Sequence, residues 1–380
     1  MSGDLLIRSL GTVTAAGTGV PALMEALSQP AWQPQLGLER PDAPPLPVAA
    51  CLGFSPQPYL PPLVARRLDR PARLLAVAAK EALRAARETL PWPRDQVGVT
   101  AGTGNAGTEA LVEVLKAVFL ASPEEAPPMH FPSTVANAPA SQLAILEKLG
   151  GPNLTFAEKQ AGGLRALVEA GRLLTHRRAA AVLACGVDEA QWLNAEAYHR
   201  LRFTRRSPSG RGPFLGEGAA VLLLAPAGNL PALARLAGWG AAALPVPTHL
   251  YPTSGEALAR AAAQALQSAG VAAADLDLVI SVHSGSRPLA QLEVEALGVV
   301  LAGHRPAAVA VTDRLGEGAF ASAVRALVAV LALGGAPIAW PAPAHLAALG
   351  FPSLTSRPRT ALVTAVAGGG SAVAAVLTAP

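Results

Sequence analysis

The chain has 380 residues, of which 51% are hydrophobic and 15% are charged, and its formal net charge at pH 7 is +4. This composition excludes a disordered chain, because the apolar content is sufficient for the core of one large or two fused domains. Acidic and basic residues are mixed along the chain, so a nucleic-acid-binding function is not expected.

The sequence also argues against a membrane span and a secretory signal. The most apolar stretch, 323–342, is interrupted by Arg325, two glycines and two prolines, whereas a span needs about 20 mainly apolar residues. The N-terminal segment carries Asp4 and lacks a long apolar region. Cys51 and Cys185 lie far apart without the spacing of metal ligands. We therefore expect a cytoplasmic protein with two reduced thiols and no bound metal.

The first part of the chain predicts alternating strands and helices. In chain order the patterns predict a strand at 4–14, a helix at 19–30, an irregular proline-rich segment at 30–63, a helix at 70–90, a strand at 96–104, a helix at 108–122, a turn, helix and strand at 132–156, a buried helix up to 174, a strand at 179–190, an arginine-rich loop, and a strand at 216–226. Such alternation favours parallel strands covered by helices on both faces.

The second part repeats this plan. It predicts a helix at 255–270, a strand at 276–286, a helix at 288–303, and a strand, glycine turn and buried helix at 306–337. The last of these matches 150–184 in layout, because both run from a strand through a short polar knot into a very apolar helix. We infer a duplicated α/β unit with halves 1–225 and 226–380. The two buried helices would then present their free N–H groups near one pocket, where they could stabilise a reacting carbonyl.

Three polar side chains fall at corresponding strand ends of this scheme. Gln160 and Glu317 open the two buried helices, and His283 ends the strand LVISVH. Each has an ordinary structural interpretation, as a helix cap for the first two and as a satisfied structural residue for the histidine. Their equivalent positions in a repeated unit favour a shared site.

Several segments resemble the β-ketoacyl synthases of the thiolase fold. The more specific ones are GEGAA at 216–220, DLVISVHSGSRPLAQLEVEAL at 277–297 and TAVAGGGSAVAAVL at 364–377. The resemblance covers nearly the whole chain and implies an α/β fold of five layers, αβαβα, with mixed, largely parallel sheets and central buried helices. It also places Asn137 in a dimer-interface segment.

The residues at the catalytic positions of this family depart from those of an active enzyme. By resemblance, Gln160 replaces the nucleophilic cysteine, His283 matches the first catalytic histidine, and Glu317 replaces the second. Thr312, Asp313 and Arg314 occupy the region in which the family usually has a lysine. Near Gly368, where a phenylalanine commonly gates the pocket, the chain has only glycine and alanine. A carboxamide is not a nucleophile and a carboxylate opposes an enolate, so we expect no condensing activity from the chain alone.

The run AEKQAGGLRAL at 157–167 resembles chain length factors, in which glutamine replaces the cysteine and QAGGL follows. The resemblance implies a non-catalytic subunit that forms a heterodimer with an active ketosynthase in bacterial type II polyketide biosynthesis, aromatic or polyene. It implies contact with acyl carrier protein mainly through that partner, and no cofactor. The acyl chain would enter a tunnel at the shared interface, for which chain position indicates Thr108, Leu111, Val112, Leu115, His130 and Phe131.

Alternative interpretations stay open at this point. The first four tunnel candidates are equally explained as core side chains, and the arginine-rich stretch 199–211 either meets an acidic carrier protein or partner or is a solvated loop. A glutamine in the cysteine position also occurs in domains that decarboxylate malonyl-carrier protein, although those keep both histidines. A homodimeric acyl-binding protein of the same fold is the third hypothesis.

Overall fold

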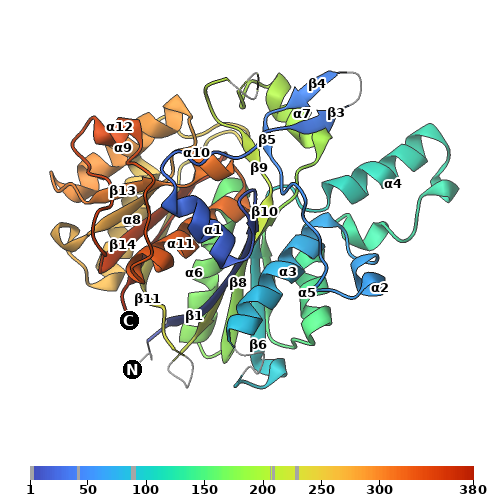
Figure 1. The fold of residues 1–380 in the computed structure, drawn as a ribbon, viewed down its shortest axis with the longest axis horizontal. Helices are drawn as coiled ribbons and strands as arrows, with labels where there is room; N and C mark the ends of the chain where they lie inside the picture. The colour runs from blue at the N-terminus through green and yellow to red at the C-terminus, as the bar shows by residue number, and fades with distance from the viewer. Residues whose placement is uncertain (1–3, 41–42, 87–90, 206, 208–209, 227–230) are drawn as a thin grey trace.

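The computed structural model describes the chain except for residues 1–3, 41–42, 87–90, 206, 208–209 and 227–230 (Figure 1). Its centre is a twisted mixed sheet in the order β13-β12-β14-β15-β11-β1-β10-β8-β6-β7, with β2 beside β1. The strands of this sheet are β1 (Leu6–Thr14), β2 (Gly17–Thr18), β6 (Val97–Gly102), β7 (Asn153–Phe156), β8 (Ala181–Asp188), β10 (Gly218–Ala225), β11 (Ala234–Ala243), β12 (Leu278–Ser281), β13 (Ala307–Ala310), β14 (Thr360–Val366) and β15 (Ser371–Thr378).

The strand order shows the duplication directly. In the first half, β7, β6 and β8 are parallel, and β10 and then β1 add in antiparallel fashion. In the second half, β13, β12 and β14 are parallel, and β15 and then β11 add in the same antiparallel way. A short antiparallel pairing of β1 with β11 joins the halves. Since β10 ends at Ala225 and β11 begins at Ala234, we propose the division between the halves at 225/226.

Helices form three layers, one outside each half of this sheet and one between the two halves. They are α1 (Val20–Ser28), α2 (Pro62–Ala65), α3 (Arg70–Ala85), α4 (Thr108–Leu120), α5 (Ala138–Glu147), α6 (Gly162–Thr175), α7 (Trp192–Arg200), α8 (Glu256–Ala269), α9 (Arg287–Leu301), α10 (Thr312–Leu315), α11 (Ala319–Leu333) and α12 (Ala344–Ala347). Residues of α3 and α5 share a hydrophobic cluster with the first half of the sheet, and α8 and α9 share one with the second half. A third cluster contains α6, α11 and strands of both halves. The expected five layers, αβαβα, are therefore confirmed.

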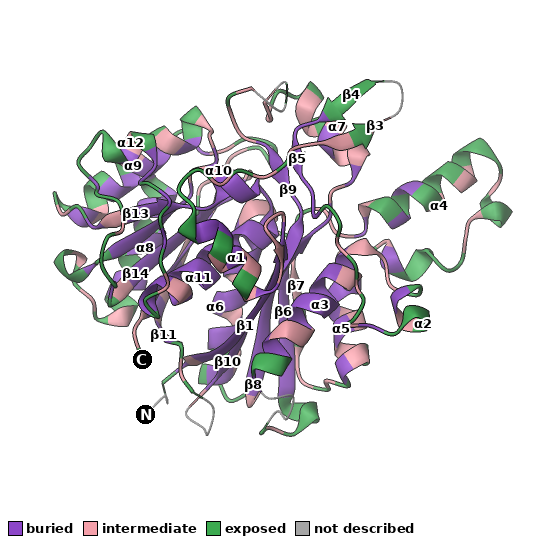
Figure 2. Ribbon diagram, in the orientation of Figure 1, coloured by how far each residue is buried: buried purple, intermediate pink, exposed green. Residues whose placement is uncertain are grey.

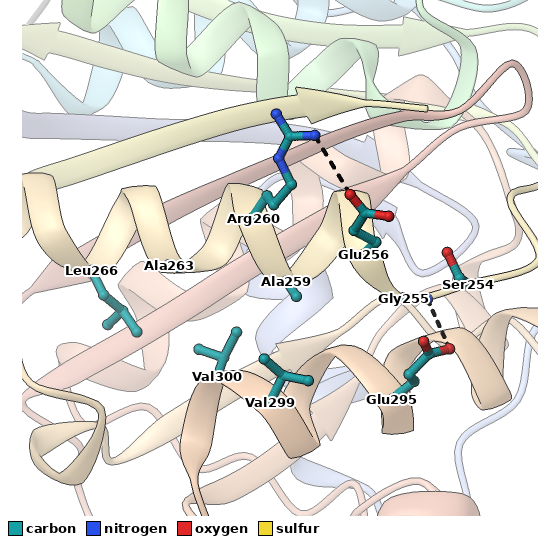
Figure 3. A pocket seen from close by; sticks show the side chains of 10 residues that line it. All are labelled: Ser254, Gly255, Glu256, Ala259, Arg260, Ala263, Leu266, Glu295, Val299 and Val300. Carbon is teal, nitrogen blue, oxygen red and sulfur yellow. Dashed lines mark hydrogen bonds and ion pairs between the residues drawn. The ribbon is translucent and has the colours of Figure 1, made fainter. Parts of the chain in front are cut away.

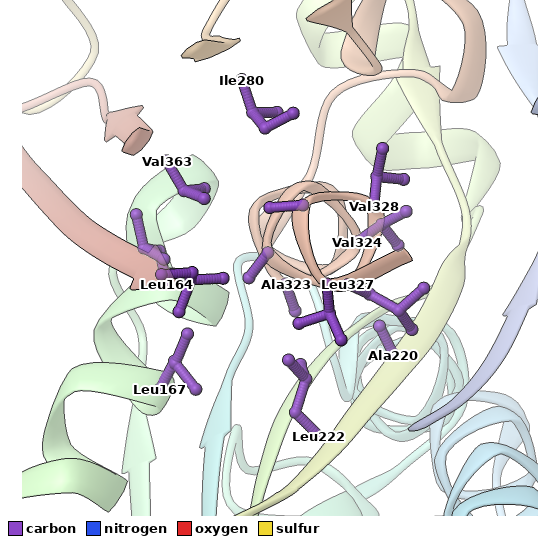
Figure 4. Packing of buried hydrophobic residues seen from close by; sticks show 14 of the residues in the cluster. Leu164, Leu167, Ala220, Leu222, Ile280, Ala323, Val324, Leu327, Val328 and Val363 are labelled. Atoms are coloured by element: carbon purple, nitrogen blue, oxygen red, sulfur yellow. The ribbon is translucent and has the colours of Figure 1, made fainter. Parts of the chain in front are cut away.

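The central helix α11 is buried along almost its whole length, and Figure 2 shows it in the colour of buried residues. Its sequence, AFASAVRALVAVLAL, offers small and β-branched side chains on every face, which suits a helix enclosed by other elements. Figure 4 shows it among side chains of α6, β10, β12 and β14, including Leu164, Ala220, Leu222, Ile280 and Val363.

The two central helices approach closely at Gly163. A Cβ atom at this position would lie 2.4 Å from the carbonyl oxygen of Ala319 and 2.8 Å from the backbone nitrogen of Ala323. Glycine is thus required for the contact that sets the two helix starts side by side. The candidate site lies at these helix starts.

The structure departs from the sequence-based prediction in several places. Strand β11 was not anticipated, and the proline-rich segment 30–63 contains α2 and the short strands β3 (Leu38–Arg40), β4 (Ala43–Leu46) and β5 (Val48–Ala49). Strand β5 pairs with β9 (Leu215–Gly216). The arginine-rich loop begins inside α7, and the end of the helix expected at 70–90 lies outside the described residues. In the described part of the chain, no helix is both long and apolar enough to cross a membrane.

Candidate functional site

Gln160 and Glu317 meet at the starts of the two central helices. Gln160 lies in a 3-10 turn, Lys159–Ala161, that runs directly into α6, and Glu317 lies between α10 and α11. The side-chain nitrogen of Gln160 donates a hydrogen bond of 3.3 Å to Glu317 Oε2. The backbone N–H of Gly368 faces the amide oxygen of Gln160 at 3.5 Å. The fold thus brings together Gln160 and Glu317, which the sequence predicts at equivalent positions of the repeated unit.

Two further hydroxyl groups converge on Glu317. Tyr251 donates to its Oε2 at 3.0 Å, and Ser284 donates to its Oε1. The carboxyl is buried, and this burial raises its pKa, while the hydrogen bonds from Ser284, Tyr251 and Gln160 act in the opposite direction. Burial likewise raises the pKa of Tyr251. The site is therefore a buried polar network in which three hydrogen-bond donors converge on the carboxyl group of Glu317.

His283 does not join this network, which corrects the expected grouping of Gln160, His283 and Glu317. Its ring packs against that of His345, with centroids 4.6 Å apart. Burial and the neighbouring His345 lower its pKa. The next residue, Ser284, takes the place beside Glu317. The physical reason is that consecutive side chains of an extended segment point to opposite sides, so a shift of one residue exchanges the group that faces the site.

A large cavity opens onto Gln160 and Glu317. Its volume is about 1180 Å³, and its lining includes Lys159, Gln160, Tyr198, Arg202, Tyr251, Ser286, Arg287, Glu317 and Gly368. A much smaller hollow bordered by Gln160, Asp188 and Gly318 measures about 10 Å³. Gln160 and Glu317 border both spaces.

Neither cysteine supplies a nucleophile to this cavity. Cys185 is fully buried within β8, and Cys51 is buried against the backbone carbonyl of Glu217. Burial raises the pKa of both thiols, which disfavours the reactive thiolate. The cysteines are also absent from the described lining of the cavity.

The region 312–314, where the family resemblance expects a lysine, forms α10 behind the site. Arg314 donates to the carbonyl oxygens of Pro30 and Trp32 and lies over the ring of Trp340. Burial raises the pKa of Asp313 to about 6. These side chains anchor the N-terminal segment of the chain, whereas the lysine that lines the cavity is Lys159, which donates to the carbonyl oxygen of Thr248.

Asp188, at the end of β8, is a residue that sequence analysis missed. Its Oδ1 accepts hydrogen bonds from the N–H groups of Gly104 and Asn105, each at 2.8 Å, and from the hydroxyl of Thr103. Its Oδ2 accepts from the N–H of Ala319, the first residue of α11, at 2.5 Å. This carboxylate therefore ties the loop that follows β6 to the start of the central helix. The sequence signal that could have identified Asp188 is the pair of acidic residues, Asp188 and Glu189, at the end of an apolar strand.

The predicted tunnel residues lie outside the cavity. Four of them belong to α4, which projects to the right of the sheet in Figure 1, and the other two are Phe131 at the start of the turn Phe131–Ser133 and His130 just before it. Leu111 and Leu115 are each 40% exposed and Phe131 is 69% exposed, whereas Val112 is buried. Thr108 is half-buried at the base of the helix, and His130 is exposed. Only Val112 fits the alternative of a core side chain.

Comparisons with known proteins agree with this architecture. A family model, "Beta-ketoacyl synthase, N-terminal domain", matches residues 58–228. The chain is 26% identical over 257 residues to 3-oxoacyl-[acyl-carrier-protein] synthase 2 of Vibrio cholerae, which covers 62% of this chain and 61% of that protein. Over these residues the chain is therefore similar to β-ketoacyl synthases. To Nodulation protein E of a Rhizobium species it is 28% identical over 250 residues, 62% of each chain. These alignments span about three fifths of the relatives' own length.

Solved structures resemble the chain over its full length. "The ishigamide ketosynthase/chain length factor" superposes with a TM-score of 0.85 and 18% identity, covering 100% of both chains. A β-ketoacyl synthase from Burkholderia phymatum gives 0.88 at 17% identity, also with 100% coverage of both. The ketosynthase ApeO in complex with its chain length factor ApeC, from Xenorhabdus doucetiae, gives 0.82 at 19% identity and covers 100% of this chain and 98% of that one. At these identities the likeness shows the fold.

A second hollow lies between α8 and α9 (Figure 3). Its volume is about 720 Å³, and its floor is apolar. Its charged groups are already engaged, because Arg260 faces Glu256 at 3.8 Å and Glu295 accepts from the N–H of Gly255 at 2.9 Å. The cavity at Gln160 is therefore the candidate functional site.

Proposed function

We propose that this chain is a non-catalytic chain length factor, the partner of an active ketosynthase in bacterial type II polyketide biosynthesis, aromatic or polyene. The observation that carries the proposal is the hydrogen bond between Gln160 and Glu317 at the starts of the central helices. In condensing enzymes of this family, as the resemblance implies, a cysteine and a histidine occupy these places. Two structural neighbours, the ishigamide ketosynthase/chain length factor and the ketosynthase ApeO in complex with its chain length factor ApeC, support the same assignment.

The chemistry of the site explains why condensation is not expected. Acyl transfer needs a thiolate that can carry the acyl group, and an amide side chain cannot. Stabilising an enolate needs hydrogen-bond donors or positive charge near the reacting oxygen. Here Glu317 instead receives the donors, since Tyr251 and Ser284 both point their hydroxyl groups at it. Within this network the polar groups of Gln160, Tyr251, Ser284 and Glu317 satisfy one another.

The projecting segment around α4 supports the heterodimer. It exposes apolar side chains that a solvated monomer would normally bury, namely Leu111, Leu115, Phe119, Leu120, Met129, Phe131 and Val135. Obligate subunit interfaces resemble a domain core cut in half, so a partner subunit is a suitable occupant of this surface. We propose that the tunnel candidates, among them Leu111, Leu115 and Phe131, face the acyl chain where the two subunits meet. Asn137, which is exposed at the start of α5, belongs to the same proposed interface.

The basic mouth of the cavity supports a minor contact with acyl carrier protein. Arg202 and Arg287 line the opening, and both side chains are exposed. The rest of the arginine-rich stretch is partly engaged elsewhere, because Arg200 pairs with Glu196 at 2.6 Å and Arg205 lies over the ring of Phe214. We propose that carrier protein docks mainly on the ketosynthase subunit.

Co-expression with the ketosynthase of the same source, one that retains its cysteine, tests this proposal. We expect a one-to-one heterodimer on gel filtration, and polyketide formation from malonyl-carrier protein only when both chains are present. The chain alone should give neither a condensed product nor CO2. Rapid CO2 release by the chain alone would indicate the decarboxylase hypothesis. A stable homodimer that ignores the ketosynthase would indicate the acyl-binding hypothesis.

A further inference from the structure

Helix α4 is anchored to the body of the protein through its first turn. Among its residues only Ala110 and Val112 are buried, and Phe119 and Leu120 at its far end are 76% and 84% exposed. In Figure 2 most of this helix has the colour of exposed residues. The direction in which the arm points therefore depends on the contacts at its base. We call residues 108–120 the α4 arm.

Glu189 supplies the cap for this helix from another element. The first N–H groups of a helix have no partner within it, and the residue before the arm, Gly107, provides no side-chain cap. Instead Glu189 Oε1 accepts a hydrogen bond of 3.1 Å from the N–H of Glu109. Asn194 adds a second tie, donating to the hydroxyl of Thr108 at 3.0 Å.

The residue before it, Asp188, fixes the loop that leads into the arm. As described above, its carboxylate holds Gly104 and Asn105 on one side and Ala319 on the other. Ala319 follows Glu317 by two residues. The end of β8 thus connects the base of the α4 arm with the start of α11, beside the candidate site.

The surroundings of Glu189 are unusually acidic. The carboxylates of Glu109, Asp69 and Glu217 face it from α4, from the start of α3 and from the residue before β10. Of these, Glu217 is paired with Arg70. Burial, followed by the charges of the three neighbours, raises the pKa of Glu189 to about 8, although its hydrogen bond from Glu109 acts in the opposite direction.

We propose that Glu189 is a proton-dependent latch for the α4 arm. The protonated carboxyl holds the first turn of the arm, and release of the proton to solvent leaves a buried negative charge among three other acids, which loosens the turn. Asp188 keeps the adjoining loop attached to α11 in both states.

The direction of the pH effect follows from the two protonation equilibria. The pKa of Glu189 is about 8 when the arm is latched. The latch requires that release of the arm opens this carboxyl group to water, which returns its pKa towards the ordinary value of 4.5. The stabilisation of the latched state is therefore complete below pH 4.5 and decreases as the pH rises. It is lost once the pH passes about 8.

The consequence for assembly rests on the proposed function. Because the α4 arm carries much of the exposed apolar surface, a loosened arm presents this surface in a less defined position. Binding to a ketosynthase should accordingly weaken as the pH rises from 6 to 8.

Hydrogen–deuterium exchange of the chain alone tests the latch without any partner. After correction for intrinsic exchange rates, we expect the protection of amides 108–113 to decrease by up to about tenfold per pH unit between pH 5.5 and 8, and then to level off. In Glu189→Gln, which keeps an oxygen acceptor but does not titrate, protection should be constant over this range. Glu113→Gln is the matched control on the same helix, since Glu113 is exposed and pairs only with Lys116 among the described residues. It should behave like the native chain.

Two results would overturn the latch. One is protection of amides 108–113 in the native chain that does not change with pH. This measurement tests the latch even if Glu189→Gln fails to fold. The other is a Glu189→Gln variant that keeps the native pH dependence, because another group would then be responsible. Amides 218–225 in β10 report on global unfolding and should stay protected throughout. Failure to bind a ketosynthase would contradict the proposed function and leave the latch unaffected.

Discussion

The side-chain amide of Gln160 lies 3.3 Å from the carboxylate of Glu317, although 157 positions separate the two residues in the chain. Each residue sits at the start of one central helix, so the contact joins the two halves of a duplicated fold. Ser284 and Tyr251 complete the same network from the second half. The site is thus a meeting point of helix starts whose polar groups bind one another.

A single Gln160→Cys substitution should not produce a condensing enzyme. The new thiol would stand beside Glu317 and Ser284 rather than beside two imidazoles, and loss of general acid–base groups typically lowers rates by about 10² to 10⁴-fold. Mass spectrometry of the products formed from an acyl thioester and malonyl-carrier protein measures the activity. Alkylation with iodoacetamide serves as the control that the thiol is reachable. Condensation at the rate of an active ketosynthase would contradict our account of the site.

Replacing Glu317 should reveal the energetic role of the network. Glu317→Ala leaves the buried hydroxyl groups of Tyr251 and Ser284 without their acceptor, which should reduce the free energy of unfolding by about 1–3 kcal/mol. Urea unfolding measures this change. An unchanged unfolding midpoint would show that the hydroxyl groups find other partners.

The Glu317→Gln variant addresses the pH dependence of the same residue. Because burial raises the pKa of Glu317 above its ordinary 4.5, the stability it contributes is complete below pH 4.5 and is lost progressively as the pH rises. The glutamine variant should therefore lose less stability than the native chain between pH 5 and pH 8. Urea unfolding at these two pH values makes the comparison, and an equal loss of stability in both proteins would argue against a raised pKa of Glu317.

Gly163→Ala should destabilise the protein more than an ordinary helix substitution. The added methyl group would lie 2.4 Å from a backbone oxygen of α11, and such overpacking costs about 1–3 kcal/mol. Gly298→Ala is the matched control, since a Cβ there has no described atom within 4 Å and should stabilise α9 by about 0.5–1 kcal/mol. Thermal or urea unfolding of both variants measures the difference. Equal effects would mean that the central helices separate easily.

Charge on the α4 arm should impair assembly without affecting the fold. Phe119 is exposed, so Phe119→Asp should change the free energy of unfolding by no more than about 0.5 kcal/mol. If it lies in the proposed interface, binding to the ketosynthase should weaken by about tenfold or more. Val299→Asp on α9 is the control, because Val299 is equally exposed but lies on the outer layer of the second half. Equal binding by both variants would remove the α4 arm from the interface.

The duplicated layout was predictable from the sequence because two apolar helices each follow a strand and a polar knot. That layout was enough to place Gln160 and Glu317 at corresponding corners. It was not enough to choose between His283 and Ser284, because a strand pattern does not fix where the alternation of side chains ends. Tyr251 lies in a connecting segment after β11 that shows no periodicity, so its approach to Glu317 depends on tertiary structure alone.

Strand β11 shows a different limit of sequence analysis. Its burial alternates regularly, as expected for a strand with one covered face. Its residues, however, are mostly alanine and glycine, which are weak strand formers. Pairing with β15 and packing of α8 therefore determine its conformation. The orientation of α4 could not be predicted either. An amphipathic pattern does not indicate whether the apolar face of a helix packs against its own chain or against a partner.

The position of α11 in the chain has a consequence for biosynthesis. This helix comes from residues 319–333, yet it packs against β8 and β10 of the first half. Until residues 319–333 have been synthesised, the first half exposes the apolar surface that α11 later covers. A fragment that stops at residue 225 should therefore aggregate or recruit chaperones, and supplying 226–380 as a separate polypeptide should rescue it.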